Sequence, residues 1–228
     1  MSKFDIQISK MSDRAILIEW PQKIEEKILD DVISFKDLIL FNQGSRIVNH
    51  TPAYASLLLQ YDQPIDFDDL RRELLALYQS SKLVIKTDKK KWHIPVCYHP
   101  SLALDLESFE SRNISYNDLV KTHSSGEYKV YMIGFLPGFL YLGGLPERLH
   151  IPRKDTPNLK TPKGAIAIGG QQTGIYPMES PGGWHVIGRT PLSLFDINSD
   201  NPTPIKQGDY IKFYEIDLKT YEVLKSED

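Results

Sequence analysis

The first 87 residues alternate between short apolar runs and longer stretches whose apolar positions recur every three or four residues. Alternating or continuous apolar runs predict strands, and helical spacing predicts amphipathic helices. The strands are predicted at residues 4–8, 15–20, 46–50, 55–60 and 83–86, and the helices at 24–35 and 66–77. This ββαββαβ order predicts an α+β domain, a small α/β sandwich whose helices cover one face of a mainly antiparallel sheet. Asp66 is expected to cap the second helix.

The chain from residue 92 onward is rich in short strands and in glycine and proline turns. Strands are predicted at residues 92–98, 128–135, 165–169, 184–188, 192–196 and 210–214, and the only helical pieces at 104–109 and 117–124. Ser115 is expected to cap the second of these helices, and the last four residues to fray. Many short strands separated by turns predict an all-β, closed or nearly closed barrel. The polar segment 87–91 then links two domains, residues 1–87 and 92–228.

One segment, residues 134–191, concentrates the residues that shape loops. It holds eleven of the fourteen glycines and eight of the fifteen prolines, interleaved with aromatic residues such as Phe139 and Trp184. Glycine supplies backbone angles that other residues avoid, and proline fixes its own. A disordered linker would lack the aromatic residues. The pattern therefore predicts loops that are held in one shape on a β scaffold and that form a site.

Charge distinguishes the same region from the rest of the chain. Between residues 148 and 189 there are six basic and two acidic residues, a local charge of +4 in a chain whose net charge is −3. A positive, glycine-rich surface suits a small anion such as a carboxylate or a phosphate. The alternative is that these are ordinary solvated charges of surface loops.

Composition excludes several classes of protein. The chain has 228 residues with 41% hydrophobic content, and no apolar run approaches the about 20 residues of a membrane span. Its start lacks the apolar core of a secretory signal. The near-neutral charge argues against nucleic acid, and the six histidines show no metal-binding spacing. Cys97, the only cysteine, lies in an apolar run and is interpreted as a buried structural thiol in a cytoplasmic protein.

Several long motifs carry a resemblance to a known family. They read GFLPGF at 134–139, YLGGL at 141–145, PR at 152–153, GQQTGIYP at 170–177, SPGGW at 180–184, IGRTP at 187–191 and FD at 195–196, with weaker matches at 13–18, 51–57 and 123–124. The chain resembles allophanate hydrolase subunit 1, the carboxyltransferase C/D domain family, over almost its whole length. The resemblance implies a small α/β N-terminal domain and a cyclophilin-like β-barrel C-terminal domain. Segment 99–106 departs from the family pattern, so a contact with substrate or partner is expected to differ there.

The candidate site residues lie in or beside the glycine-rich segment. Catalytic roles are assigned to His123 and Arg189, and substrate binding to Arg153, Lys163, Gln171, Gln172, Thr173, Tyr176 and Thr190. An arginine presents a planar fork that suits a carboxylate or phosphate, and amide side chains offer donors and acceptors to a lactam or ureido group. Histidine titrates near neutrality, which suits acid–base chemistry.

Each of these roles has a structural alternative. His123 follows a short predicted helix and is equally suited to a capping or core position, and Arg189 to an ion pair with Asp196. Tyr176 is equally suited to packing against Trp184.

The resemblance implies a subunit of a 5-oxoprolinase, in which ATP-dependent ring opening converts 5-oxo-L-proline to L-glutamate. It implies two partners, a second cyclophilin-like subunit of the allophanate hydrolase subunit 2 type and a lactam-hydrolysing subunit. ATP, with Mg, is expected in the assembled complex, although the chain has no phosphate-binding Walker A sequence. No metal is expected on this chain. Two alternatives remain, an inhibitor that binds a sensor histidine kinase and a biotin-dependent carboxyltransferase or allophanate hydrolase-type subunit.

Overall fold

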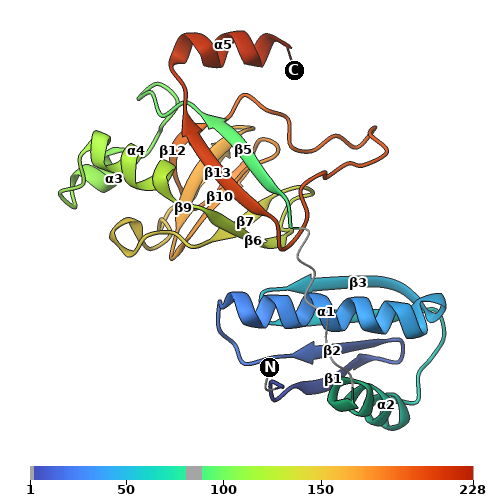
Figure 1. The fold of residues 1–228 in the computed structure, drawn as a ribbon. Helices are drawn as coiled ribbons and strands as arrows, with labels where there is room; N and C mark the ends of the chain where they lie inside the picture. Colours follow the sequence, from blue (N-terminus) through green and yellow to red (C-terminus); the bar gives the residue numbers. More distant parts are fainter. Residues whose placement is uncertain (1–2, 81–88, 228) are drawn as a thin grey trace. The chain divides into compact units, whose positions relative to one another are not determined.

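The computed structural model describes residues 3–80 and 89–227 and divides the chain into two compact units, residues 1–88 and 89–228 (Figure 1). The predicted strand at 83–86 lies outside the described residues, as does part of the linking segment 87–91. No helix in the described part of the chain is both long enough and apolar enough to cross a membrane.

The N-terminal unit is a four-stranded antiparallel sheet with two helices. Its elements are β1 (Gln7–Ser12), β2 (Ala15–Glu19), α1 (Glu26–Gln43), the 3-10 turn η1 (Gly44–Arg46), β3 (Ile47–Ala53), β4 (Ser56–Tyr61) and α2 (Phe67–Ser80). The strand order is β1-β2-β4-β3. Apolar side chains of β2 and β4 join those of both helices in one core. Asp66 caps α2 as expected, because its carboxylate accepts a hydrogen bond from the Asp69 backbone, 3.1 Å away.

Several boundaries in this unit differ from the prediction. The first strand begins at Gln7 rather than at residue 4, and α1 continues to Gln43 rather than ending near Phe35. The helix continues because Ile39 extends its apolar face and is completely buried. Asp31, on α1, accepts hydrogen bonds from the Trp20 indole at 2.8 Å and the Tyr78 hydroxyl at 2.6 Å, and so ties the end of β2 to both helices.

The C-terminal unit contains a nearly closed barrel. Its seven-stranded sheet has the order β12-β9-β10-β7-β6-β13-β5 and is antiparallel except between β13 and β5. The strands are β5 (Lys91–Val96), β6 (Tyr128–Ile133), β7 (Leu140–Gly143), β9 (Ala165–Gly169), β10 (Gln172–Ile175), β12 (His185–Arg189) and β13 (Tyr210–Glu215). Just beyond β5, Cys97 pairs with Arg189 at the end of β12. The two edges of the sheet therefore meet, and the structure is an α+β fold with a barrel.

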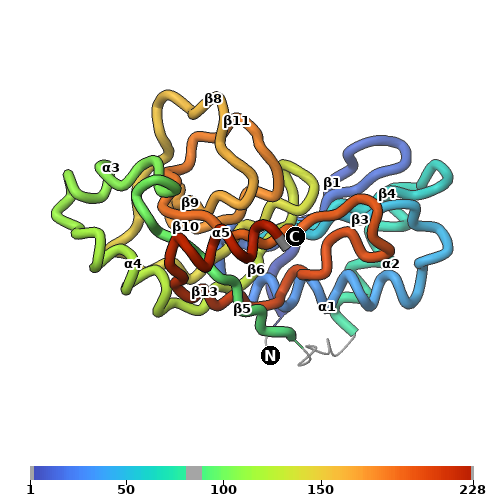
Figure 2. Tube along the Cα trace, turned by 90° about the horizontal axis from the view of Figure 1, so that it is seen from above, coloured from blue at the N-terminus to red at the C-terminus, as the bar shows by residue number. Residues whose placement is uncertain are grey.

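Smaller elements surround the barrel. They are α3 (Glu107–Glu110), α4 (Tyr116–Ser125), the 3-10 turn η2 (Glu147–Leu149), β8 (Asn158–Thr161), β11 (Ser180–Gly182) and α5 (Leu218–Glu227). Strands β8 and β11 pair at the edge of the barrel, where Figure 2 shows them side by side. Ser115 caps α4 as predicted, because its hydroxyl accepts a hydrogen bond from the Asp118 backbone at 3.2 Å.

Three predictions for this unit are wrong. Residues 104–109 and 117–124 are not its only helical pieces, because α5 is a further helix. Residues 192–196 form no strand, because Pro191 and the turns after Asp196 leave this segment without a partner strand. Within the tail predicted to fray, residues 225–227 belong to the helix α5, which is held by the buried ring of Tyr221, and Asp228 lies outside the described residues. The interpretation of Cys97 as a buried thiol is confirmed, since the thiol is free and buried and burial raises its pKa.

Candidate functional site

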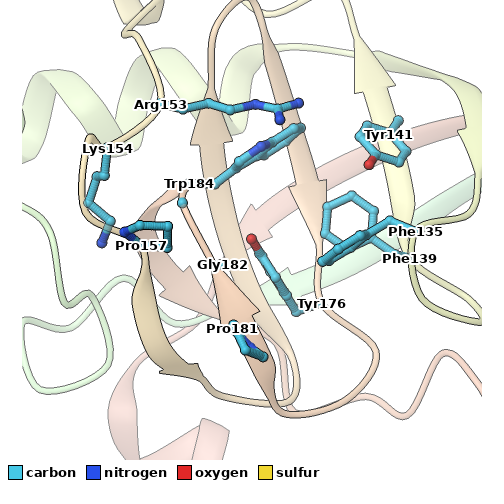
Figure 3. A pocket seen from close by; sticks show the side chains of 11 residues that line it. Phe135, Phe139, Tyr141, Arg153, Lys154, Pro157, Tyr176, Pro181, Gly182 and Trp184 are labelled. Carbon is cyan, nitrogen blue, oxygen red and sulfur yellow. The ribbon is translucent and has the colours of Figure 1, made fainter.

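An aromatic pocket opens on the surface of the barrel. It encloses about 350 Å³ and is lined by Phe135, Phe139, Tyr141, Arg153, Lys154, Pro157, Tyr176, Pro181, Gly182, Gly183 and Trp184. These residues come from the β6–β7 loop, from β7, from the loop before β8, and from the segment around β11 (Figure 3). All of them belong to the glycine- and proline-rich segment, so the predicted shaped loops do form a pocket.

Phe139 organises the aromatic walls of this pocket. Its ring makes edge-to-face contacts with Tyr141, Tyr176 and Trp184, with centroids 4.7, 4.9 and 5.6 Å apart. Such contacts add stability beyond the area that is buried. Because Phe139, Tyr176 and Trp184 are all buried, the walls are rigid and their faces are fixed before any ligand arrives. The pocket therefore suits a flat or cyclic ligand.

Two basic residues stand beside these walls. The Arg153 guanidinium lies 5.6 Å from the centre of the Trp184 ring, across which Figure 3 shows it extended. Arg153 is exposed, so it can turn toward a ligand while it stacks on the indole. Lys154 is held in place, because its backbone N–H donates to Gly183 at 2.8 Å and its ammonium group donates to Asp105 at 2.8 Å. A pocket with a cation at its rim suits an anionic group on the ligand.

Tyr176 supplies a hydroxyl group to this pocket. Burial raises the pKa of the phenol to about 12. The phenol is therefore protonated at neutral pH and can donate a hydrogen bond. The ring of Tyr176 packs against Phe139 in the aromatic cluster, and the residue also lines the pocket.

His123 lies in the barrel interior, away from the pocket. The ring is completely buried, with Nδ1 2.7 Å from the Tyr98 hydroxyl and Nε2 2.9 Å from the Thr173 hydroxyl. It stacks on Phe213 with centroids 4.8 Å apart, and burial lowers its pKa to about 3. The imidazole is neutral and inaccessible, so its surroundings favour the core alternative over acid–base catalysis. Thr173 shares this buried position and cannot contact a ligand in the pocket.

Three other candidates gather in a second pocket. Lys163, Arg189, Thr190, Pro191, Leu192, Tyr221 and Lys225 line a space of about 230 Å³, here called the seam pocket because it lies where the sheet edges meet. The structure therefore separates Arg153 and Tyr176 from Arg189, Lys163 and Thr190. The alternative ion pair between Arg189 and Asp196 is absent from the described residues.

Gln171 and Gln172 line neither pocket. Gln171 is exposed in the turn between β9 and β10, and Gln172 is buried at the start of β10.

The sequence reasoning missed several residues of these pockets. Tyr141 and Pro157 line the aromatic pocket, while Tyr221 and Lys225 reach the seam pocket from α5, a helix that was not predicted. Asp105 was missed as well, although it lies in segment 99–106, where a changed contact was expected. Its contact with Lys154 shows that this segment supports the wall of the aromatic pocket. In residues 3–80 and 89–227, no group of three or more His, Cys, Asp or Glu side chains is placed to hold a metal ion.

The comparisons with known proteins cover nearly the whole chain. The family model described as carboxyltransferase domain, subdomain C and D, matches residues 6–205. The 5-oxoprolinase B subunit of Bacillus subtilis is 34% identical over 233 residues, which cover 97% of this chain and 97% of that protein. The 5-oxoprolinase B subunit of Haemophilus influenzae is 44% identical over 150 residues, covering 65% of this chain and 70% of that protein.

A solved structure shows the same fold. The crystal structure of TTHA0988 matches with a TM-score of 0.77 and 29% identity over 90% of this chain, which spans 40% of the length of TTHA0988. Together with the family model and the relatives, this match establishes the family. The chain belongs to the carboxyltransferase domain family, subdomain C and D.

Proposed function

We propose that this protein is the B subunit of a 5-oxoprolinase and supports the ATP-dependent opening of 5-oxo-L-proline to L-glutamate. The observation that carries this proposal is the end-to-end similarity to the 5-oxoprolinase B subunit of Bacillus subtilis, 34% identical over 97% of both chains. Similarity along the full length of both chains means that both units have counterparts in that protein.

The proposed partners and location follow from the same family. A second cyclophilin-like subunit of the allophanate hydrolase subunit 2 type would pair with this chain, whose barrel we take to be cyclophilin-like. A lactam-hydrolysing subunit would complete a cytoplasmic complex. The protein would be inactive alone, since a subunit-specific role leaves part of the chemistry to the partners.

The aromatic pocket is the proposed binding site for 5-oxoproline. The substrate is a flat five-membered lactam with one carboxylate. The rings of Phe139, Tyr141 and Trp184 offer apolar faces to the lactam ring, and Arg153 offers a guanidinium fork to the carboxylate. The protonated hydroxyl of Tyr176 can donate a hydrogen bond to the lactam oxygen.

ATP, with Mg, would transfer its terminal phosphoryl group to the lactam oxygen and leave as ADP; the lactam carbon would then be activated toward attack by water, and phosphate would be released as the ring opens. This chain would hold the lactam in one orientation, and its basic residues would stabilise the negative charge that develops on that oxygen. The partner chains would supply the remaining groups of the reaction.

The test is glutamate release from 5-oxoproline and ATP by this protein with and without its two partner subunits. We expect release only from the three-subunit mixture. An Arg153→Ala variant should assemble and lose turnover, while Lys160→Ala, which removes an exposed cation of β8, should retain it. An assembled complex without activity would refute the oxoprolinase role and favour the carboxyltransferase alternative, which urea with a biotin carrier would then test.

One observation favours the second candidate, an inhibitor that docks onto a histidine kinase. Phe135 has a backbone φ of +72° and its side chain is 62% exposed. A bulky residue rarely adopts this backbone conformation, and here Phe135 stays largely exposed although its ring makes an edge-to-face contact with Phe139, with centroids 5.7 Å apart. A docked partner would cover the ring. Micromolar capture of a kinase dimerisation domain, lost in Phe135→Ser, would support this candidate.

A further inference from the structure

The seam pocket collects positive charge from three separate parts of the chain. Lys163 lies in the turn between β8 and β9, Arg189 ends β12, and Lys225 lies on α5. Within the described residues, the only carboxylate that pairs with any of them is that of Glu222, 3.8 Å from the Lys225 ammonium group. Like charges repel, so three cations around one small space favour an anion between them.

Arg189 is fixed in place before any ligand binds. Its backbone N–H and C=O are both hydrogen-bonded to Cys97, each at 2.9 Å, across the seam of the barrel. Its side-chain Nε donates to the Lys163 carbonyl at 2.6 Å, which orients the guanidinium group. The outer Nη groups make no hydrogen bond within the part of the chain that the structure describes. A guanidinium that is held along one edge and open along the other suits an oxyanion.

The walls of the seam pocket are packed rather than loose. Gly164 has φ of +79°, and a Cβ at this position would lie 2.4 Å from the Thr190 carbonyl oxygen. Only glycine lets the Lys163 turn approach Thr190 this closely, and the Thr190 N–H donates to the Gly164 carbonyl at 2.9 Å. On the opposite wall, the buried Tyr221 anchors α5 and so places Lys225.

We propose that the seam pocket binds a phosphate group, either as inorganic phosphate or as the phosphate end of a nucleotide. A phosphate monoester carries about −1.5 to −2 charge near pH 7 and three strong acceptor oxygens, whereas a carboxylate carries a single charge. Three cations match the phosphate better. The volume of about 230 Å³ lies below the roughly 300–1,000 Å³ of pockets for drug-sized ligands, so a phosphate enters and a nucleoside stays outside. This site is separate from the proposed ring opening, because the binding of phosphate to it can be measured without that reaction.

The test titrates the full chain with inorganic phosphate at low ionic strength and follows binding by ³¹P NMR and calorimetry. We expect saturable binding that a Lys163→Gln/Lys225→Gln double variant weakens by about 10-fold or more, since charge-assisted bonds to an oxyanion are the strong ones. Lys160→Gln is the matched control, because it removes an exposed cation of β8 outside the pocket and should change the affinity less than about 2-fold. Both pocket lysines are exposed, so the double variant keeps the fold.

Arg189→Gln gives a second, independent variant. It keeps the backbone bonds to Cys97 and should weaken phosphate at least as much as the double variant. Tighter binding of ADP than of phosphate identifies a nucleotide as the ligand, and equal binding identifies free phosphate; both outcomes support the site. The proposal is overturned by a lack of saturable binding at millimolar phosphate, by equal losses in Lys160→Gln, or by acetate that competes as well as phosphate does. None of these outcomes bears on glutamate release, so the two proposals fail separately.

Discussion

Asp105 and Lys154 form an ion pair with 2.8 Å between carboxylate and ammonium, and each side chain is only 14% exposed. The second carboxylate oxygen accepts a hydrogen bond from the Val186 N–H at 2.7 Å. One side chain thus connects the segment before α3 to strand β12 and to the loop that carries Arg153. Because that loop forms a wall of the aromatic pocket, the pair links the barrel to the proposed substrate site.

We expect Asp105→Ala to lower the free energy of unfolding by about 2–4 kcal/mol. The variant removes two hydrogen bonds that involve a charged group, each worth about 1.5–3 kcal/mol, and leaves the largely buried Lys154 ammonium group without its partner. Urea unfolding monitored by circular dichroism measures the change. Asp155→Ala is the control, since it removes an exposed carboxylate next to Lys154 and should cost less than about 0.5 kcal/mol. Equal costs in the two variants would contradict the linking role.

Because His123 is buried as a neutral imidazole, we expect the protein to lose stability in acid. Burial lowers the pKa of the folded imidazole to about 3, whereas an unfolded histidine titrates near 6.5. Between these values the unfolded chain binds a proton that the folded protein does not, so stability falls as the pH drops below 6.5. The slope from this one residue is at most about 1.4 kcal/mol per pH unit.

Urea unfolding between pH 7 and pH 4 tests this slope. His123→Gln should be less stable at pH 7, because the hydrogen bonds to Tyr98 and Thr173 are disturbed, yet it should lose this part of the pH dependence. His99→Gln, at an exposed histidine, should keep the full slope. An unchanged slope in His123→Gln would show that the imidazole is not held neutral.

Two neighbouring glycines that line the aromatic pocket should respond differently to alanine. A Cβ at Gly182 would lie 2.4 Å from the Tyr176 hydroxyl and 2.8 Å from the Thr161 hydroxyl, whereas a Cβ at Gly183 meets nothing closer than 3.7 Å. Thr161 is completely buried, so its side chain has little room to move. Gly182→Ala should therefore displace the Tyr176 ring and cost about 1–3 kcal/mol, the usual range for overpacking.

Thermal unfolding and the fluorescence of Trp184 measure this pair of variants. Gly183→Ala should match the parent protein in both. If Gly182→Ala also leaves stability and fluorescence unchanged, the side chains around Gly182 can move enough to accept the added methyl group, and the predicted overpacking is wrong.

The apolar pattern predicted those strands that have at least one face buried along most of their length. Residues 165–169 were predicted to the residue as β9, where every side chain is buried, and 15–20 and 210–214 came within one residue of β2 and β13. Strands β7 and β10 were missed because each has only four residues and contains a glycine, which weakens the strand signal. The helix α5 was missed because, among the side chains that the structure describes, Tyr221 is its only buried one. Leu218 and Leu224 lie at helical spacing from Tyr221 but are only half-buried, so the apolar face of this helix is weak.

The sequence identified the region of the candidate site but could not show that its residues form two separate pockets. The glycine and proline content identified residues 134–191 as the site-forming loops, yet Arg153 and Arg189 carry the same chemistry on a similar background. Only the pairing of strands places Arg153 beside Trp184 and Arg189 beside Cys97. In the same way, a histidine at position 123 gives no sign that Tyr98 and Thr173, 25 and 50 residues away along the chain, enclose its two nitrogens.

The role of Arg153 yields the sharpest test of the aromatic pocket. If its guanidinium group pairs with the substrate carboxylate, Arg153→Ala should weaken the binding of 5-oxoproline by about 10-fold, and the quenching of Trp184 fluorescence reports binding. The lactam 2-pyrrolidinone has the same ring without the carboxylate. It should therefore bind more weakly than 5-oxoproline, and with the same affinity to the parent protein and to Arg153→Ala. Arg148→Ala removes an arginine that pairs with Asp118 outside the pocket and should change neither affinity. Equal losses for both lactams in Arg153→Ala would mean that Arg153 shapes the indole wall rather than recognising the carboxylate, and the substrate anion would then have to be bound elsewhere.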